Sequence, residues 1–271
     1  MKTILQSIPV IQSRLLTASG LVRHCFSTRL GGKSTGPYAA MNLGFGRGEE
    51  REIVAENMSA LCQALGVAEE KVVFGKQVHD VQVYQLAGQS PMTGRFQSSL
   101  TGYDALMTNE PSWTLVTDHA DCVPVFLLDP CHRAIAMIHA GWRGTAGRIV
   151  QHTLADMETA YDTRPQDVLA YIGPSIGPCC FQVGEEVRDA FLEKIPQSEQ
   201  AIKRDATPQK WKIDLWAVNQ ALLQEAGVPE TQIEIEGLCT MCHGELFYSH
   251  RAMGESRGSM AAFLSLKELE P

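Results

Sequence analysis

Ile135-Ala136-Met137-Ile138-His139-Ala140-Gly141-Trp142-Arg143-Gly144-Thr145-Ala146-Gly147-Arg148 is the stretch that decides the expected fold. An apolar strand ends in a histidine, passes through small residues and enters a helix. In α/β proteins, ligands bind where strands end and helices begin. Backbone N–H groups at Gly144 to Gly147, with Arg143 beside them, would suit an anion such as phosphate. The alternative is a tight strand-to-helix turn with a surface arginine.

Helical and strand patterns alternate along the rest of the chain. An apolar face with a spacing of three to four residues predicts a helix over 49–66, which Gly66 ends. Asp214 is expected to cap a helix that reaches Ala226. Further helices are expected at 145–161 and 185–195, two extended pieces at 71–86, and strands at 104–109, 113–128, 134–139, 168–172, 233–238 and 261–266. The pattern indicates an α/β fold with mixed sheets, and leaves the strand order open.

Composition and charge exclude several classes of protein. The chain has 271 residues, 44% hydrophobic and 20% charged, which is enough apolar material for a sizeable core. A net charge of −8 without a basic stripe argues against a nucleic-acid partner. No apolar run has the length of a signal peptide or a membrane span, so we expect no membrane partner. We therefore expect a soluble cytoplasmic protein whose eight cysteines are reduced.

Two further segments carry residues able to do chemistry. Cys122 precedes a buried strand, where a cysteine is usually a small hydrophobic residue, and His79 follows a run of strand-forming residues. The separations of 43 and 17 residues between His79, Cys122 and His139 do not form a local zinc module. Thiolate and imidazole nevertheless bind zinc or copper well, and three protein ligands would leave a fourth position open for water or substrate.

Two further cysteine motifs are candidates for binding or redox chemistry. Cys239-Thr240-Met241-Cys242-His243 has the form of a haem attachment motif, but such attachment would require an exported chain. No second C-x-x-C motif completes a zinc knuckle, so we interpret the segment as a strand end and turn. The pair Cys179-Cys180 would form either a strained vicinal disulfide or part of a shaped loop over a pocket.

Several segments together resemble the motifs of one family, the YfiH-like proteins. This family is also known as laccase-domain or multicopper polyphenol oxidase proteins and as the peptidoglycan editing factor. The matches run in order from about Val22 to Phe263. The segments are Ser27-Thr28-Arg29-Leu30-Gly31-Gly32, Met41-Asn42-Leu43-Gly44, Lys76-Gln77-Val78-His79, Ala120-Asp121-Cys122-Val123-Pro124, His139-Ala140-Gly141-Trp142-Arg143-Gly144, Gly173-Pro174-Ser175-Ile176-Gly177 and Phe247-Tyr248-Ser249-His250-Arg251.

The resemblance implies a layered α/β/β/α fold with mixed sheets, and it favours a single domain over residues 1–271. It also implies a metal site made of His79, Cys122 and His139. Arg29, Asn42 and Arg143 fall in motifs that would line the same pocket. The chain departs from the family pattern at His250, where typical members carry tyrosine, and we interpret that histidine as a packing residue.

The activities that the resemblance implies can be weighed against the residues. A multicopper oxidase needs several copper centres, commonly bound by His-x-His pairs, and none of the eight histidines forms such a pair. Nucleoside phosphorolysis needs an anion site, which Arg143 and the following turn would supply. A cysteine hydrolase with Cys122 as nucleophile and His79 or His139 as base is the metal-free alternative.

We therefore expect a zinc-dependent purine nucleoside phosphorylase that acts on inosine or adenosine with phosphate. Adenosine deamination and methylthioadenosine phosphorolysis are further activities that the resemblance implies. Cys122, His79, His139 and Arg143 would be catalytic, and Arg29, Asn42 and Arg143 would contact the substrate. The alternatives are a copper-dependent polyphenol oxidase, a hydrolase that edits peptidoglycan precursors, and a non-enzymatic binder of metal or nucleoside.

Overall fold

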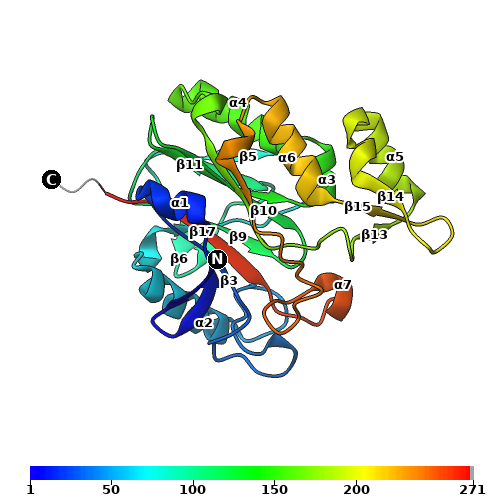
Figure 1. Cartoon of the computed structure of the whole chain (residues 1–271). Helices are drawn as coiled ribbons and strands as arrows, with labels where there is room; N and C mark the ends of the chain where they lie inside the picture. The colour runs from blue at the N-terminus through cyan, green and yellow to red at the C-terminus, as the bar shows by residue number, and fades with distance from the viewer. Residues whose placement is uncertain (269–271) are drawn as a thin grey trace.

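Two six-stranded mixed sheets face each other at the centre of the molecule (Figure 1). The structure is a computed structural model that describes residues 1–268. In order, the first sheet contains β1 (Lys2–Leu5), β2 (Ile8–Ile11), β3 (Val22–Ser27), β17 (Met260–Leu266), β9 (Thr114–His119) and β4 (Val72–Val73). The second contains β16 (Ile233–Ile235), β12 (Leu169–Ile172), β10 (Val123–Asp129), β11 (Ala134–Ala140), β8 (Ala105–Thr108) and β5 (Val83–Gln85).

Helices cover the outer face of each sheet, which gives the expected α/β/β/α layers. The first sheet is covered by α2 (Arg51–Leu65), and the second by α3 (Trp142–Ala146), α4 (Ile149–Tyr161) and α6 (Leu215–Glu225). Helix α1 (Arg14–Ser19) contacts β3 and β12, and α7 (His250–Met253) lies in the connection between β16 and β17. The other connections include η1 (Gly36–Tyr38), η2 (Glu69–Lys71), η3 (Pro165–Asp167), η4 (Pro196–Ala201) and η5 (Glu230–Gln232).

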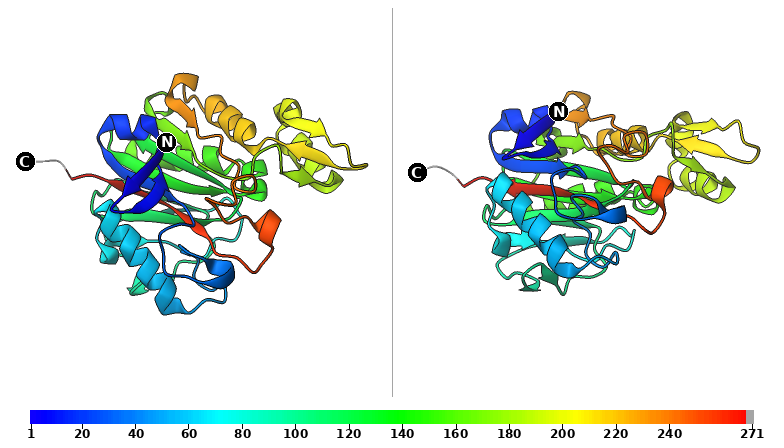
Figure 2. Two further views of the ribbon diagram at one scale, coloured as in Figure 1. Left: turned by 60° about the horizontal axis from the view of Figure 1, so that its bottom comes forward. Right: turned by 90° about the horizontal axis from the view of Figure 1, so that it is seen from below.

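A smaller sheet projects from one end of the molecule, as both views of Figure 2 show. It consists of β13 (Gln182–Val183), β15 (Trp211–Ile213) and β14 (Ile202–Arg204), and α5 (Glu185–Lys194) packs beside it. A separate hairpin is formed by β6 (Met92–Gly94) and β7 (Gln97–Ser98).

Three apolar clusters fill the spaces between the layers. Between the two sheets, Phe26 and Leu264 of the first sheet meet Phe126 of the second. The space under α2 is filled by Met58, Leu61 and their neighbours, and the largest cluster joins the second sheet to α3, α4 and α6. Strands β10 and β11 are buried along their whole length, as their continuous apolar runs predicted.

Most expected elements are confirmed, and the reasons are local. Helix α2 ends where Gly66 adopts a left-handed conformation (φ 71°) and its N–H donates to Cys62 O and Gln63 O. Helix α6 begins where the Asp214 carboxylate accepts hydrogen bonds from the next turn. The strands expected at 104–109, 134–139, 168–172, 233–238 and 261–266 are present as β8, β11, β12, β16 and β17.

Two expected elements were wrong as single pieces. The strand expected over 113–128 is two strands, because the chain leaves β9 in the first sheet and enters β10 in the second, with Asp121 (φ 86°) at the turn. A run buried on both faces has no alternation that would reveal such a change of sheet. The helix expected over 145–161 is interrupted between α3 and α4, because Arg148 takes a left-handed conformation (φ 64°).

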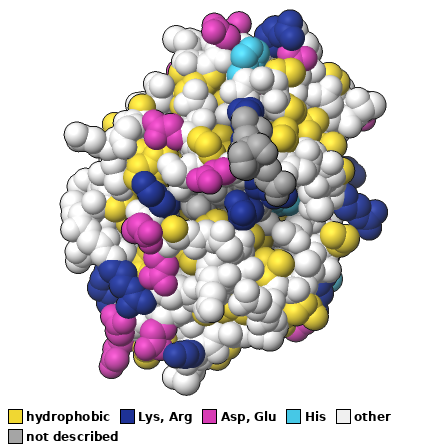
Figure 3. All heavy atoms as spheres, turned by 90° about the vertical axis from the view of Figure 1, so that its left-hand side faces the viewer, with side chains coloured by type: hydrophobic (Ala, Val, Ile, Leu, Met, Phe, Trp, Pro, Cys, Tyr) yellow, Lys and Arg dark blue, Asp and Glu magenta, His cyan; other side chains and the backbone are white. Residues whose placement is uncertain are grey.

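One face of the molecule carries side chains of both charges. Figure 3 shows one face, on which Lys and Arg side chains are interspersed with Asp and Glu side chains. Within residues 1–268, no helix combines the length and the apolar character that crossing a bilayer requires.

The cap of α6 provides a test of the fold. We predict that Asp214→Ala lowers the free energy of unfolding by about 1 kcal/mol, because Asp214 Oδ1 accepts hydrogen bonds from Trp216 N and Ala217 N at 3.1 Å each. Asp156→Ala, at an exposed position inside α4, is the control and should change stability little. Urea unfolding of both variants makes the measurement, and equal destabilisation would contradict the capping role.

Candidate metal centre

The structure brings His79, Cys122 and His139 together, with donor atoms that all lie within 4.8 Å of one another. Cys122 stands directly before β10, and His139 lies near the end of β11 opposite Pro124. His79 comes from the loop that precedes β5. His79 is exposed, Cys122 is half-buried and His139 is buried. The cluster therefore has a protected side and an open side.

The buried carboxylate of Asp104 organises two of the three donors. Its oxygens accept hydrogen bonds from the backbone N–H groups of Val78, His79 and Asp80 at 3.0, 2.9 and 3.0 Å. One of these oxygens also lies 2.8 Å from Nδ1 of His139. Since Nδ1 of His139 is engaged in this way, its Nε2 is the nitrogen left for a metal.

The loop that carries His79 is held against the first sheet by Gln77. The Gln77 amide donates to Asp118 O at 3.0 Å and accepts from Asp118 N at 2.7 Å. His79 itself has a left-handed backbone (φ 63°), which an ordinary side chain seldom adopts. Hydrogen bonds to Asp118 and Asp104 on either side hold the backbone in this conformation.

Charge within the cluster favours a thiolate at Cys122. Burial alone would raise the pKa of this thiol, but His139 and His79 beside it lower the pKa to about 6. Burial alone would lower the pKa of His139, but the Cys122 thiolate and the Asp104 carboxylate raise it instead. A thiolate is the form that both metal binding and nucleophilic attack require.

The three donors suit a zinc or copper ion. One thiolate and two imidazoles are common ligands of both metals, and a three-residue set leaves one position of a tetrahedral ion free. Gly141 lies directly against the cluster: a Cβ there would be 3.0 Å from His79 Cδ2 and 3.2 Å from Cys122 Sγ. A glycine at this position keeps the space beside the donors open.

Sequence reasoning missed three residues of this centre. Asp104 was taken only as the start of a strand, although it orders two donors. His119 is buried, its Nδ1 lies 3.1 Å from Cys122 O, and its ring centroid lies 5.3 Å from that of His139. Asp121 adopts the turn that presents Cys122. For His119 and Asp121, the sequence signal was the clustering of Asp118, His119, Asp121 and Cys122 within five positions.

A hollow of about 690 Å³ opens beside the cluster, and His79 lines it. Trp142 and Arg143 line the same hollow, and the Arg143 guanidinium lies 4.3 Å from the centre of the Trp142 ring. Lys194 of α5 adds a second cation, and Asp80 adds an acidic group. The hollow has the size of a small-molecule site.

The structure gives partners for two of the four backbone amides at Gly144 to Gly147, where an anion site was expected. Helix α3 begins at Trp142, so Thr145 N donates to Gly141 O and Gly147 N donates to Arg143 O, both at 2.8 Å. The amides of Thr145 and Gly147 therefore donate within the chain, and the expected anion site stays a prediction for the other two. The Arg143 side chain is exposed and remains available to an anion.

Arg29 and Asn42 make contacts that support the surrounding loops. The Arg29 guanidinium donates to Ala39 O and to Gly244 O, and it stacks on the Tyr248 ring. Asn42 is fully buried; its amide donates to Glu49 at 2.8 Å, and its oxygen accepts from two backbone N–H groups. These contacts shape the loop after β3, and neither residue lines the hollow beside His79.

The remaining candidates lie outside the cluster. His250 is half exposed and faces Glu255 at 4.0 Å. The four cysteines Cys179, Cys180, Cys239 and Cys242 form a separate group. The structure thus completes the C-x-x-C motif, which had no partner in the sequence, with an adjacent pair from another loop.

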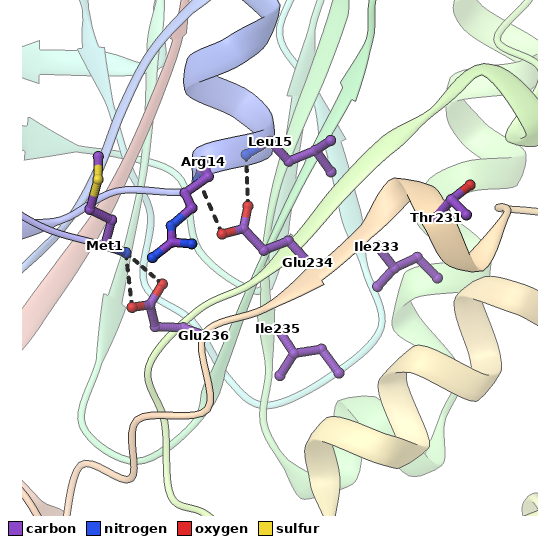
Figure 4. Close-up of a pocket in the computed structure, with 8 residues that line it drawn as sticks. All are labelled: Met1, Arg14, Leu15, Thr231, Ile233, Glu234, Ile235 and Glu236. Atoms are coloured by element: carbon purple, nitrogen blue, oxygen red, sulfur yellow. Dashed lines mark hydrogen bonds and ion pairs between the residues drawn. The ribbon is translucent and has the colours of Figure 1, made fainter.

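A second hollow lies against β16 and carries no reactive group (Figure 4). The Met1 amino group lies 2.9 Å from both carboxylate oxygens of Glu236. Glu234 accepts hydrogen bonds from the backbone N–H groups of Arg14 and Leu15. Both carboxylates are already paired and no cysteine or histidine lines this hollow, so we assign no chemistry to it.

The sequence was compared with known families and proteins. Residues 23–267 match the family described as multi-copper polyphenol oxidoreductase laccase. A purine nucleoside phosphorylase of Bacteroides thetaiotaomicron is 39% identical over 247 residues, which cover 90% of this chain and 91% of that protein. Purine nucleoside phosphorylase YfiH of Escherichia coli is 33% identical and covers 90% of this chain and 94% of its own.

Solved structures agree with the layered architecture. The crystal structure of the Bacillus licheniformis hypothetical protein YfiH has a TM-score of 0.87, at 31% identity, and covers 96% of both chains. The crystal structure of YlmD from Geobacillus stearothermophilus has a TM-score of 0.86, at 34% identity, and covers 91% of this chain and 92% of its own.

The role of Asp104 can be tested directly. We predict that Asp104→Asn weakens zinc binding about 10- to 100-fold, because an amide cannot accept from three backbone N–H groups and the histidine as the carboxylate does. The matched control is Asp129→Asn at the far end of β10. Asp129 also accepts from two backbone N–H groups and lies 2.9 Å from a histidine Nδ1.

Competition with a chelating dye gives the zinc affinities of both variants, and urea unfolding gives their stabilities. Asp129→Asn should lose stability and keep its zinc affinity. Equal affinity in the two variants would show that Asp104 only supports the fold.

Proposed function

The chain belongs to the family described as multi-copper polyphenol oxidoreductase laccase, and we propose that it is a zinc-dependent purine nucleoside phosphorylase. Relatives that match about nine-tenths of the chain carry the name purine nucleoside phosphorylase, which supports a phosphorylase-type function. The proposed substrates are inosine- and adenosine-type nucleosides together with phosphate. Adenosine deamination and methylthioadenosine phosphorolysis are further activities proposed for the same pocket.

The observation that supports this proposal is that His79 belongs both to the donor cluster and to the lining of the hollow. It is one of the three donors in the cluster with Cys122 and His139. It also lines the hollow together with Trp142 and Arg143. A ligand in that hollow would touch both the donor cluster and a free cation. This combination suits a substrate pair that contains a neutral nucleoside and an anion.

The reaction assigns a separate task to each part of the site. A phosphate oxygen forms a bond to C1′ of the ribose, the bond from C1′ to the purine nitrogen breaks, and the purine leaves with that electron pair and takes up a proton. Zinc bound by the three donors would supply Lewis acidity at its open position. Arg143 would neutralise and orient the phosphate, and Trp142 would offer an apolar surface to the nucleoside.

The oxidase alternative is less well supported by the donor groups. Reduction of oxygen by several copper ions requires adjacent clusters of imidazoles. Within residues 1–268 the two candidate ligand groups are one thiolate with two imidazoles and a set of four thiols. A single copper ion at the first group would be compatible with its ligands, so oxidation of phenols by purified protein is the measurement that supports this alternative.

We predict that purified zinc-loaded protein converts inosine to hypoxanthine and ribose 1-phosphate only when phosphate is present. Cys122→Ser and His139→Ala should lose this activity together with the metal of this centre. Liquid chromatography of the products makes the measurement. Free ribose as the product would make the enzyme a hydrolase, and release of an amino acid from a muramyl precursor without nucleoside turnover would favour cell-wall editing.

The proposed role of Arg143 has a control within the chain. We predict that Arg143→Ala raises the KM for phosphate about tenfold or more, the loss expected for one charge-assisted hydrogen bond, and changes the KM for inosine less. Arg188 stacks on Trp211 at 4.0 Å in the same manner, but it does not line the hollow. Arg188→Ala should therefore keep both constants, and a similar loss in both variants would contradict the assignment.

A further inference from the structure

A group of four cysteines lies outside the centre described above. The Sγ atoms of Cys179, Cys180, Cys239 and Cys242 all lie within 4.8 Å of one another. Cys242 Sγ is 3.5 Å from Cys179 Sγ and 3.4 Å from Cys180 Sγ. No role in the proposed phosphorylase reaction accounts for this group.

Regular pairing of two neighbouring strands brings the four thiols together. Strands β12 and β16 run parallel, and the segments that follow them stay side by side. Ser175 pairs with Cys239, and Thr240 N donates to Ser175 O at 3.0 Å. Each segment then turns back, one at Gly177 to Cys180 and the other at Cys239 to His243. The two cysteine pairs therefore meet as a direct result of sheet topology.

We propose that Cys179, Cys180, Cys239 and Cys242 bind a structural zinc ion as four thiolates, in a site separate from that of Cys122. Tetrahedral zinc with bonds of about 2.3 Å to sulfur places its ligands about 3.8 Å apart. The two separations from Cys242 Sγ, 3.5 and 3.4 Å, are slightly shorter than that value, and the other sulfur pairs lie within 4.8 Å. A structural zinc site is closed by four protein ligands, and four thiolates are one of its common sets.

The backbone around the group supports negative charge at one of the four sulfurs, that of Cys239. Gly177 N donates a hydrogen bond to Cys239 Sγ at 3.3 Å. A Cβ at Gly177 would lie 2.7 Å from Trp216 Cη2 and 3.3 Å from Cys179 Sγ, so only glycine allows this approach without displacing a neighbour. The Arg251 guanidinium donates to Cys180 O at 3.2 Å and adds positive charge beside the group. Four thiolates around Zn²⁺ carry a net charge of −2, which this arginine would partly neutralise.

Disulfide formation accounts for the geometry less well. Cys242 is close to both Cys179 and Cys180. A single disulfide would use one of these contacts, and two of the four thiols would remain unbonded. A metal ion uses all four sulfurs at once. Cys179 and Cys242 are exposed, which gives an ion access from solvent.

The proposed zinc would also support the turn that presents Cys122. Thr240 lies between Cys239 and Cys242, and its hydroxyl donates to Asp121 at 2.6 Å. The other loop contributes as well, because Ile176 N donates to Asp121 O at 2.9 Å. A metal that fixes both loops therefore holds Asp121 in its left-handed conformation (φ 86°). Loss of this metal should slow the enzyme without removing the metal bound at Cys122.

Metal counting tests the proposal independently of any activity. Protein purified with zinc should contain about two ions per chain by elemental analysis. Cys122→Ser should keep one ion, and Cys239→Ser combined with Cys242→Ser should also keep one. Cys131→Ser removes an exposed cysteine outside both groups and should keep both ions.

Cobalt substitution identifies the ligands even where a double variant folds poorly. The Cys122→Ser protein loaded with Co²⁺ should show the intense sulfur-to-cobalt charge-transfer absorption of a tetrathiolate site, and Cys179→Ser should weaken that absorption. A wild-type protein with a single ion that Cys122→Ser removes would overturn the proposal. Mass spectrometry that finds a disulfide within the group in freshly purified protein would overturn it as well. Two ions per chain without inosine turnover would support this site while contradicting the proposed phosphorylase function.

Discussion

The buried carboxylate of Asp104 is the constraint on which the candidate metal centre depends. It accepts hydrogen bonds from three consecutive backbone N–H groups of the loop with His79, and it contacts Nδ1 of His139. Burial would raise the pKa of this carboxyl, but the hydrogen bonds with His139 and with the backbone of Asp80 and Val78 lower it. One charge therefore fixes two donors that come from different parts of the chain. A neutral amide of the same shape has one acceptor oxygen in place of two, so part of these half-buried N–H groups would lose their acceptor.

The connection between the two sheets places the third donor. Because β9 ends in the first sheet and β10 begins in the second, the chain crosses between the layers at Asp121 and Cys122. Asp121 takes a positive φ there and accepts hydrogen bonds from Thr240, Ser249 and the backbone of Arg251. Cys122 thus owes its position to segments near the C-terminal end of the chain. The proposed zinc at the four cysteines would stabilise one of these segments.

The sequence predicted elements and motifs better than it predicted their arrangement. Gly66 and Asp214 mark helix ends because local backbone chemistry requires such residues there, whereas the place of β17 between β3 and β9 depends on pairing that no local pattern records. The resemblance supplied His79, Cys122 and His139 as a set, and their spacing alone did not. The role of Asp104 and the meeting of Cys179-Cys180 with the C-x-x-C motif were missed, because each depends on a partner that is distant in the sequence. The expectation of one domain over residues 1–271 stays a prediction, and residues 269–271 lie outside the described part of the chain.

The family description and the names of the relatives suggest different chemistry, and the donor sets favour one over the other. An oxidase that reduces oxygen with several copper ions must keep those ions close enough to exchange electrons, which needs many imidazoles around one cavity. Here His119, the third histidine near the centre, is buried; its Nδ1 and Nε2 contact Cys122 O and Thr117. Burial lowers the pKa of His119, so it remains neutral, and it supports the turn at Cys122 through hydrogen bonds. With this imidazole engaged, the centre offers ligands for one ion, and one ion beside a free arginine suits group transfer to phosphate.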